Sequence, residues 1–234
     1  MIAVEICAST LRDVAVAMEA GADRVELCSV WGVGGITPNV VVVESAVAMG
    51  MPCRALIRPR EGHFLFSPSE RTWSVEEAKV MMDCGAERVV VGALTLEGRL
   101  DEAYLDAMCE AVGSENVVWH RAIDVSQDPD ADIALLAKRG VSEVLSSGGC
   151  VRAVEGTDRL KRWAEIGMSV VAGGGVRPED VTELGKAGVQ AVHASCRITE
   201  RSGDSPLFDS ATHPVDYAKV LDLVNASKSL EDHV

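Results

Sequence analysis

The chain contains 234 residues, with 36 acidic against 22 basic side chains and a formal net charge of −14 at pH 7. This acidity excludes a nucleic-acid-binding protein, because proteins that bind the phosphate backbone carry an excess of Lys and Arg. Hydrophobic residues make up 47% of the chain and aromatic residues only 4%, which excludes disorder and an aromatic platform for stacking bases.

Two further features bear on the compartment. No apolar stretch reaches the roughly 18 residues of a membrane span, and the first five residues lack the basic flank of a signal peptide. The seven cysteines are an odd number without a CxxC spacing, which favours reduced thiols. We therefore expect a cytoplasmic protein that has no membrane partner.

Short β-branched runs alternate with segments of helical period along most of the chain. We predict eight strands, at Ile2–Cys7, Arg24–Cys28, Cys53–Arg58, Arg88–Val91, Val117–His120, Glu143–Leu145, Ser169–Ala172 and Gln190–Ser195. Helix starts are predicted at Thr37-Pro38, at a capping box over Ser74–Glu77, at Asp128-Pro129 and at Arg177-Pro178-Glu179. This is the repeated βα pattern of an α/β protein.

Glycines mark the repeat. Gly21, Gly85, Gly140 and Gly188 each close a predicted helix just before a strand, where glycine serves as a left-handed cap. The second, third and fourth units also resemble the sixth, seventh and eighth, as expected for a doubled half-barrel. We predict a single (β/α)8 TIM barrel that forms one domain over residues 1–234.

Two E-x-C pairs lie within the first two predicted strands. Glu5 and Cys7 alternate with apolar neighbours, as do Glu26 and Cys28, so both pairs should face the barrel interior. Buried carboxylates require cations or hydrogen-bond donors. Arg58 and Arg60, which end the third strand, are candidates. The alternative is a purely structural ion network at the barrel top.

The fifth strand ends in His120-Arg121-Ala122-Ile123-Asp124, where His120 and Asp124 share a parity. A histidine at the carboxyl end of a barrel strand can act as acid, base or ligand. The alternative is a histidine that is satisfied by a backbone carbonyl. His193, near the end of the eighth strand, carries a weaker signal.

Six residues are therefore the candidate catalytic set, and we expect them to line one pocket at the carboxyl end of the barrel. They are Glu5, Glu26, Arg58, Arg60, His120 and Asp124.

A glycine run, Gly173-Gly174-Gly175, follows the seventh strand, where barrels of this class commonly bind phosphate. Ser146, Gly148 and the rest of the Ser146–Gly149 turn, together with Ser195, are expected to complete an anion cradle. The alternative is a tight turn that only allows the next helix to pack.

Cys7 and Cys28 lie on neighbouring predicted strands, close enough to hold one soft ion such as Cu(I) between two thiolates. The alternative is that both are small buried hydrophobic residues, an interpretation that suits Cys84 and Cys109 on predicted helices better.

The motifs, taken together and in order, resemble the CutC family over about the first 200 residues. They are Val25-Glu26-Leu27-Cys28, Gly34-Gly35-Ile36-Thr37-Pro38, Ile57-Arg58-Pro59-Arg60, His120-Arg121-Ala122-Ile123-Asp124, Ser146-Ser147-Gly148 and Gly173-Gly174-Gly175-Val176.

The resemblance implies a cytoplasmic barrel concerned with copper homeostasis, with Cu(I) on cysteines. Cys28 stands inside a matching motif, and Cys7, Cys53 and Cys196 are the other cysteines that the resemblance brings forward. The chain departs from the family pattern at His63, where relatives usually carry an acid, and at Ala191, where they often carry Glu.

Three functions stay open at this point. The resemblance favours a Cu(I)-binding homeostasis protein, whereas the polar residues at one barrel mouth favour an enzyme that acts on a small anionic metabolite. The third is a non-catalytic barrel that serves as a binding partner. We expect a copper ion or a small anionic ligand as the partner and no nucleic acid. The sequence is also compatible with a homo-oligomer.

Overall fold

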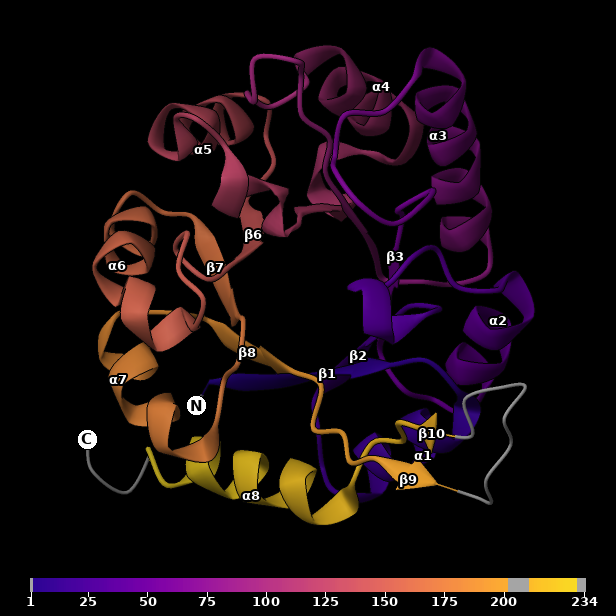
Figure 1. The fold of residues 1–234 in the computed structure, drawn as a ribbon, viewed down its shortest axis with the longest axis vertical. Helices are drawn as coiled ribbons and strands as arrows, with labels where there is room; N and C mark the ends of the chain where they lie inside the picture. The colour runs from indigo at the N-terminus through magenta and orange to yellow at the C-terminus, as the bar shows by residue number, and fades with distance from the viewer. Residues whose placement is uncertain (1, 202–210, 231–234) are drawn as a thin grey trace.

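The computed structural model describes residues 2–201 and 211–230. Eight parallel strands close into a barrel in the order of the sequence, and helices surround it (Figure 1). The predicted (β/α)8 barrel is therefore confirmed. Within the described residues, no helix is long and apolar enough to cross a membrane.

All eight predicted strands are present. They are β1 (Ala3–Ala8), β2 (Arg24–Leu27), β3 (Cys53–Leu56), β4 (Arg88–Val91), β5 (Val117–Trp119), β6 (Glu143–Ser146), β7 (Ser169–Gly173) and β8 (Ala191–Ala194). Strand β8 pairs with β1, with Glu5 aligned to His193, and this pairing closes the barrel.

The helices lie outside the strands. They are α1 (Leu11–Glu19), α2 (Val40–Ala48), α3 (Pro68–Asp83), α4 (Glu102–Val112), α5 (Pro129–Lys138), α6 (Thr157–Glu165), α7 (Val181–Lys186) and α8 (Tyr217–Lys228). Short 3₁₀ turns occupy Trp31–Val33, Ser114–Asn116, Arg121–Val125, Ala153–Gly156 and Pro178–Asp180.

Two predicted helix starts are correct and two are wrong. Asp128 caps α5 with Pro129 in the first position, and Arg177 precedes the turn that begins at Pro178. Helix α2 instead begins after Asn39, because Thr37 hydrogen-bonds to Arg58 and Glu77 rather than to a helix amide.

Ser74 lies in the middle of α3. The capping box of this helix is formed earlier, by Ser67 and Glu70. The Ser74 hydroxyl donates to the carbonyl of Glu70 within the helix. The spacing of Ser74 and Glu77 alone does not distinguish such a mid-helix serine from a capping residue. The four repeat glycines, by contrast, all have the predicted positive φ.

Side-chain parity separates the interior from the outer layer. Residues such as Val4 and Ile6 belong to the large apolar core between strands and helices. A second, smaller cluster inside the barrel contains Cys7, Cys28 and Leu56. Because strand side chains alternate, the polar side chains of the E-x-C pairs face inward, as predicted.

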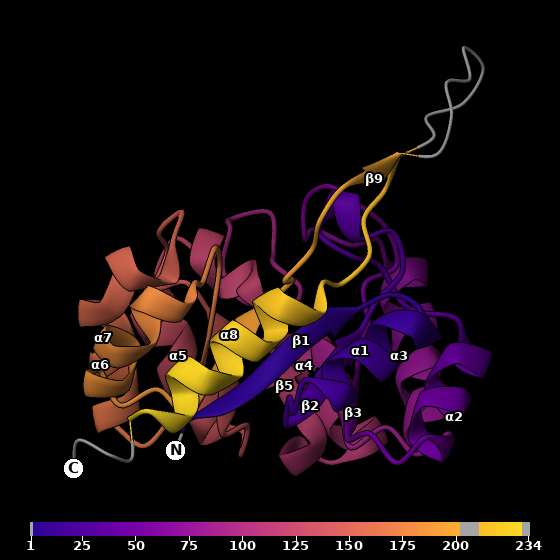
Figure 2. The same ribbon diagram turned by 90° about the horizontal axis from the view of Figure 1, so that it is seen from below.

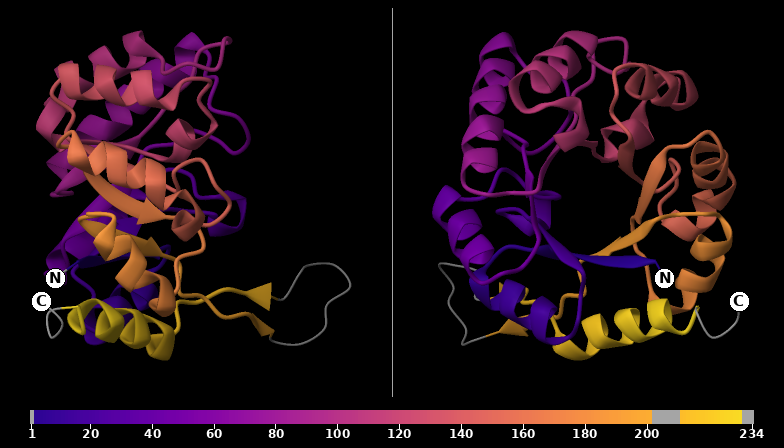
Figure 3. Two further views of the ribbon diagram at one scale, coloured as in Figure 1. Left: turned by 90° about the vertical axis from the view of Figure 1, so that its left-hand side faces the viewer. Right: turned by 180° about the vertical axis from the view of Figure 1, so that it is seen from behind.

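The two ends of the chain meet at β1. Helix α8 lies beside β1 and against α1 and α7, so it closes the helical ring (Figures 2 and 3). A short antiparallel pair, β9 (Glu200–Arg201) with β10 (Ala211–Thr212), projects from the body of the barrel (Figure 2).

Candidate functional site

A cavity of about 700 Å³ opens at the carboxyl ends of the strands. Cys7, Glu26, Arg58, His120 and His193 are among its lining residues. Five basic and three acidic side chains line it in all, an excess of cations in a protein whose net charge is −14. This volume is typical of a small-molecule site and far exceeds that of a metal ion.

Glu5 lies below this cavity, and its predicted place in the lining is wrong. Its carboxylate accepts from Arg24 Nε at 2.5 Å and lies 3.1 Å from Arg54 Nη1. Glu143 accepts from both Nη atoms of Arg54 at 2.6 and 3.0 Å and from Arg88 at 2.5 Å. These five side chains, which we call the floor network, stand at the amino half of the barrel, where Arg24, Arg88 and Glu143 begin their strands.

Arg60 also lies outside the cavity lining. It donates to Glu70 at 2.6 Å and to the carbonyls of Glu61, His63 and Leu65, so it organises its own loop. The strand ends at Leu56, and strand parity therefore no longer governs where Arg60 points. The family departure at His63 is on this exposed loop.

Asp124 is absent from the cavity lining as well, because its carboxylate is used by the turn after β6. It accepts from the Ser146 hydroxyl at 2.5 Å, from the Ser147 amide at 3.0 Å and from the Gly149 amide at 3.2 Å. Arg121 Nε donates to it at 2.8 Å.

The Ser146–Gly149 turn is thus an anion cradle, as its glycines suggested, but its anion is the chain's own Asp124. The amide of Gly148 donates to the Ser146 hydroxyl rather than outward. The prediction that Ser146 and Gly148 hold an external ligand is therefore wrong for these atoms.

The residues of the glycine run after β7 lie in two different environments. Gly174, Gly175 and Ser195 line the cavity, in agreement with their predicted place. Gly173 ends β7, and a side chain at this position would collide with Leu145, so it serves packing. Whether the other three bind an anion stays a prediction.

The two candidate metal ligands are close together. Cys7 Sγ and Cys28 Sγ are 3.5 Å apart, both are buried, and the Ser9 hydroxyl lies 3.6 Å from Cys28 Sγ. A side chain on Gly35 would collide with Leu56 and with Cβ of Cys28 at 3.0 Å, so the glycine of the Gly-Gly-Ile-Thr-Pro motif allows this loop to cover the pair.

The pKa values of the two thiols shift in opposite directions. The hydrogen bond with Cys7 lowers the pKa of Cys28 to about 7, although burial opposes the shift. The same hydrogen bond and burial raise the pKa of Cys7 well above its usual value. Cys28 is therefore the thiol of the pair that ionises first, with Cys7 as its S–H donor.

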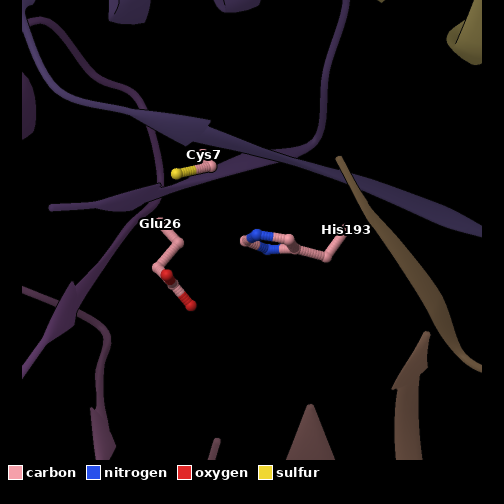
Figure 4. Close-up of side chains that lie close together, drawn as sticks. All are labelled: Cys7, Glu26 and His193. Atoms are coloured by element: carbon pink, nitrogen blue, oxygen red, sulfur yellow. The ribbon is translucent and has the colours of Figure 1, made fainter. Parts of the chain in front are cut away.

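His193 and Glu26 complete this corner of the cavity. One ligand atom from each of Cys7, Glu26 and His193 lies within 4.8 Å of the others, and the three side chains converge in Figure 4. His193 Nδ1 lies 2.8 Å from the Glu5 carboxylate, which leaves Nε2 for the cavity. A carboxylate that orients a histidine in this way is common behind metal ligands.

The pKa values of these groups reflect their burial. Burial raises the pKa of Glu26 to about 7, and its Oε2 has no hydrogen-bond partner among the described residues. Burial would lower the pKa of His193, but the carboxylates of Glu26 and Glu5 raise it overall. Burial would likewise raise the pKa of Glu5, yet His193, Arg24 and Arg54 hold it well below its usual value.

His193 belongs to the site, although its sequence signal is weak. It shares the inward parity of Ser195 and pairs in register with Glu5, so the E-x-C motif on β1 marks its partner.

Cys53 and Cys196 contribute no third thiol to the pair formed by Cys7 and Cys28. Cys53 packs in the outer core and donates to the Met51 carbonyl, and Cys196 lies at the cavity rim. Burial raises the pKa of each to about 11.

These features define a (β/α)8-barrel protein with a cavity at the carboxyl ends of its strands and a buried cysteine pair at that cavity. The CutC family profile matches residues 2–198, and the chain belongs to the CutC family.

Individual relatives agree with this assignment. A CutC protein from Pasteurella multocida is 34% identical over 197 residues, covering 82% of this chain and 81% of that protein. One from Chromobacterium violaceum is 36% identical over 198 residues, covering 82% and 80%. A crystal structure of CutC from Streptococcus agalactiae, described as a copper homeostasis protein, superposes with a TM-score of 0.77 at 28% identity and covers 82% of this chain and 98% of its own.

Proposed function

We propose that this protein binds Cu(I) through the thiolates of Cys7 and Cys28 and serves copper homeostasis in the cytoplasm, where thiols stay reduced. The observation that carries the proposal is the 3.5 Å separation of two buried sulfurs on neighbouring strands. The copper-related description of the Streptococcus agalactiae relative supports the choice of metal.

The donor set suits a soft ion. Thiolates select Cu(I), and imidazole is an acceptable further ligand, so His193 Nε2 is the third donor that we propose. Two bonds of roughly 2.2 Å each would place the sulfurs about 4.5 Å apart, so the pair has to open by about 1 Å.

Binding must displace protons. Cys28 is already ionised above about pH 7, whereas Cys7 has to release its S–H proton to the metal. His193 must also be neutral to coordinate, and its raised pKa adds a second proton to the exchange. The affinity for Cu(I) is therefore expected to rise steadily with pH across the neutral range.

The test is a competition between the reduced protein and a Cu(I) chelator. Cys84→Ser and Cys109→Ser are the controls, because each removes one thiol, as Cys28→Ser and Cys7→Ser do. We expect one Cu(I) per wild-type chain and in both controls, with binding lost in Cys28→Ser and Cys7→Ser. His193→Gln should weaken binding about tenfold while keeping the thiolates.

Three results would overturn the proposal. The first is a wild-type protein that holds no Cu(I) against the chelator. The second is an equal loss in all four cysteine variants, which would mean non-specific capture by thiols. The third is a preference for Zn(II) at the same site, which would assign the cluster to Glu26 with Cys7 and His193.

A further inference from the structure

The wall of the cavity formed after β3 and β5 has features that copper binding does not use. Arg58 is buried and lines the cavity, yet its guanidinium donates only to carbonyls, of Val33, Gly35 and Gly62, at 2.8–3.0 Å. No carboxylate in residues 2–201 and 211–230 forms an ion pair with it, and its Nε has no partner there. A buried cation without a counter-ion is costly, and an anionic ligand would compensate it.

His120 stands next to Arg58 with one ring nitrogen unused. The Ala122 amide donates to Nδ1 at 3.1 Å, so the neutral ring must carry its proton on Nε2. Nε2 is buried and has no partner in the described part of the chain. Burial and the neighbouring Arg58 lower the pKa of His120 to about 3, which keeps it a neutral N–H donor at physiological pH.

The backbone preserves this arrangement. Gly92 follows β4, and a Cβ at this position would come within 2.4 Å of the His120 ring, so glycine provides the space that the ring occupies. The Phe64 ring lies 5.0 Å from the His120 ring and 5.2 Å from the Arg58 guanidinium, and it shields this wall on one side.

Arg121 extends the wall toward the glycine run. Its charge also lowers the pKa of His120, and a Cβ at Gly174 would lie 3.3 Å from its guanidinium. Asp124 accepts from its Nε and Ser147 from its Nη2. Arg58, His120 and Arg121 thus form a continuous row of donors in the cavity, which we call the donor wall.

We propose that the donor wall binds the oxyanion head of a small organic ligand, a carboxylate or a phosphate, whose body occupies the rest of the 700 Å³ cavity. His120 Nε2–H and Arg58 supply the donors, and Gly174 and Gly175 border the same space. The donors of this site are different residues from the cysteine pair in the same cavity, and the proposal does not depend on copper binding.

The experiment titrates inorganic phosphate and malonate, in separate arms, into wild-type protein and into His120→Leu, His120→Gln and Cys28→Ser. The readouts are calorimetry and the NMR signal of the His120 Nε2 proton. Glutamine can place an amide N–H near the position of Nε2, and leucine cannot. Arg139→Gln, at the C-terminal cap of α5 and outside the cavity, is the control for non-specific binding of anions to a cation elsewhere in the protein.

We expect one anion to bind and to shift the His120 proton signal. Affinity should fall about tenfold or more in His120→Leu and stay within about threefold of wild type in His120→Gln, Cys28→Ser and Arg139→Gln. Tighter binding of phosphate would identify a phosphate ester as the ligand class, and tighter binding of malonate a carboxylic acid.

Two results would overturn the proposal. One is that neither anion binds at millimolar concentration. The other is binding that leaves the His120 proton signal unmoved, which would place the anion elsewhere. If His120→Leu fails to fold, the proposal is tested by the shift of the His120 proton signal in wild type and by the affinity of His120→Gln for the anion. Loss of copper binding in Cys28→Ser with anion binding intact separates this proposal from the copper proposal.

Discussion

The barrel interior contains two groups of charged side chains that differ in how completely they are paired. In the floor network at the amino half, every carboxylate meets at least two cations at 2.5–3.6 Å, although Arg24 Nη2 and Arg54 Nε have no hydrogen-bond partner in residues 2–201 and 211–230. At the carboxyl half, Glu26 Oε2, Arg58 Nε and His120 Nε2 are buried and have no partner among the described residues, and the Glu26 carboxylate has no arginine or lysine within ion-pair distance there. The floor carboxylates are thus compensated by cations of the chain itself, whereas the uncompensated groups at the mouth are candidates for contact with a ligand.

The comparison also separates two kinds of glycine-rich turn. In the turn after β6, the amides of Ser147 and Gly149 already donate hydrogen bonds to Asp124. The turn after β7 presents Gly174 and Gly175 to the cavity. A glycine run predicts an anion site in both places, and the hydrogen bonds of the fold show that in the turn after β6 the anion is a carboxylate of the chain itself.

The largest effect is expected from Glu143→Ala. Removing this carboxylate leaves Arg54 and Arg88 buried or half-buried without their main partner, which should lower the free energy of unfolding by about 3–5 kcal/mol. Urea denaturation would measure the loss. Replacing Glu143, Arg54 and Arg88 together with Leu, Met and Met should restore most of it, and failure to do so would assign the floor network a role beyond charge pairing.

An intermediate effect is expected from Asp124→Ala. The amides of Ser147 and Gly149 then lose their acceptor, and the free energy of unfolding should fall by about 2–3 kcal/mol. Because the empty cradle resembles an anion site, added sulfate should stabilise the variant more than the wild type in thermal unfolding. Equal stabilisation of both proteins would contradict the assignment of Asp124 as the anion of this turn.

A smaller, pH-dependent effect is expected from Glu26→Gln. Burial raises the folded-state pKa of Glu26 to about 7, so the stability that it contributes is fully present below about pH 4.5 and is lost as pH rises through 7. Glutamine does not titrate, and the variant should therefore be more stable than wild type by about 3 kcal/mol at pH 8 and equal to it near pH 4. Denaturation at both pH values gives the difference directly, and a constant difference would show that Glu26 has an ordinary pKa.

Much of this protein is predictable from local pattern. The alternation of β-branched runs with helical segments and the glycines before β2, β4, β6 and β8 determine the eight βα units, because strand and helix periods and glycine caps are local properties of the chain. Strand parity likewise places Glu26, Cys7 and Cys28 inside the barrel, since it depends only on the alternation of successive side chains.

The tertiary structure decided what each inward side chain meets. Depth along the barrel axis depends on the stagger between strands, so Glu5 joins arginines at the floor while Glu26, on the next strand, has no ion pair with a described arginine at the mouth. Arg60 and Asp124 lie beyond the strands, where parity no longer applies and loop contacts direct them away from the cavity. The pairing of His193 with Glu5 joins residues 188 positions apart, and only closure of the barrel between β8 and β1 brings them together.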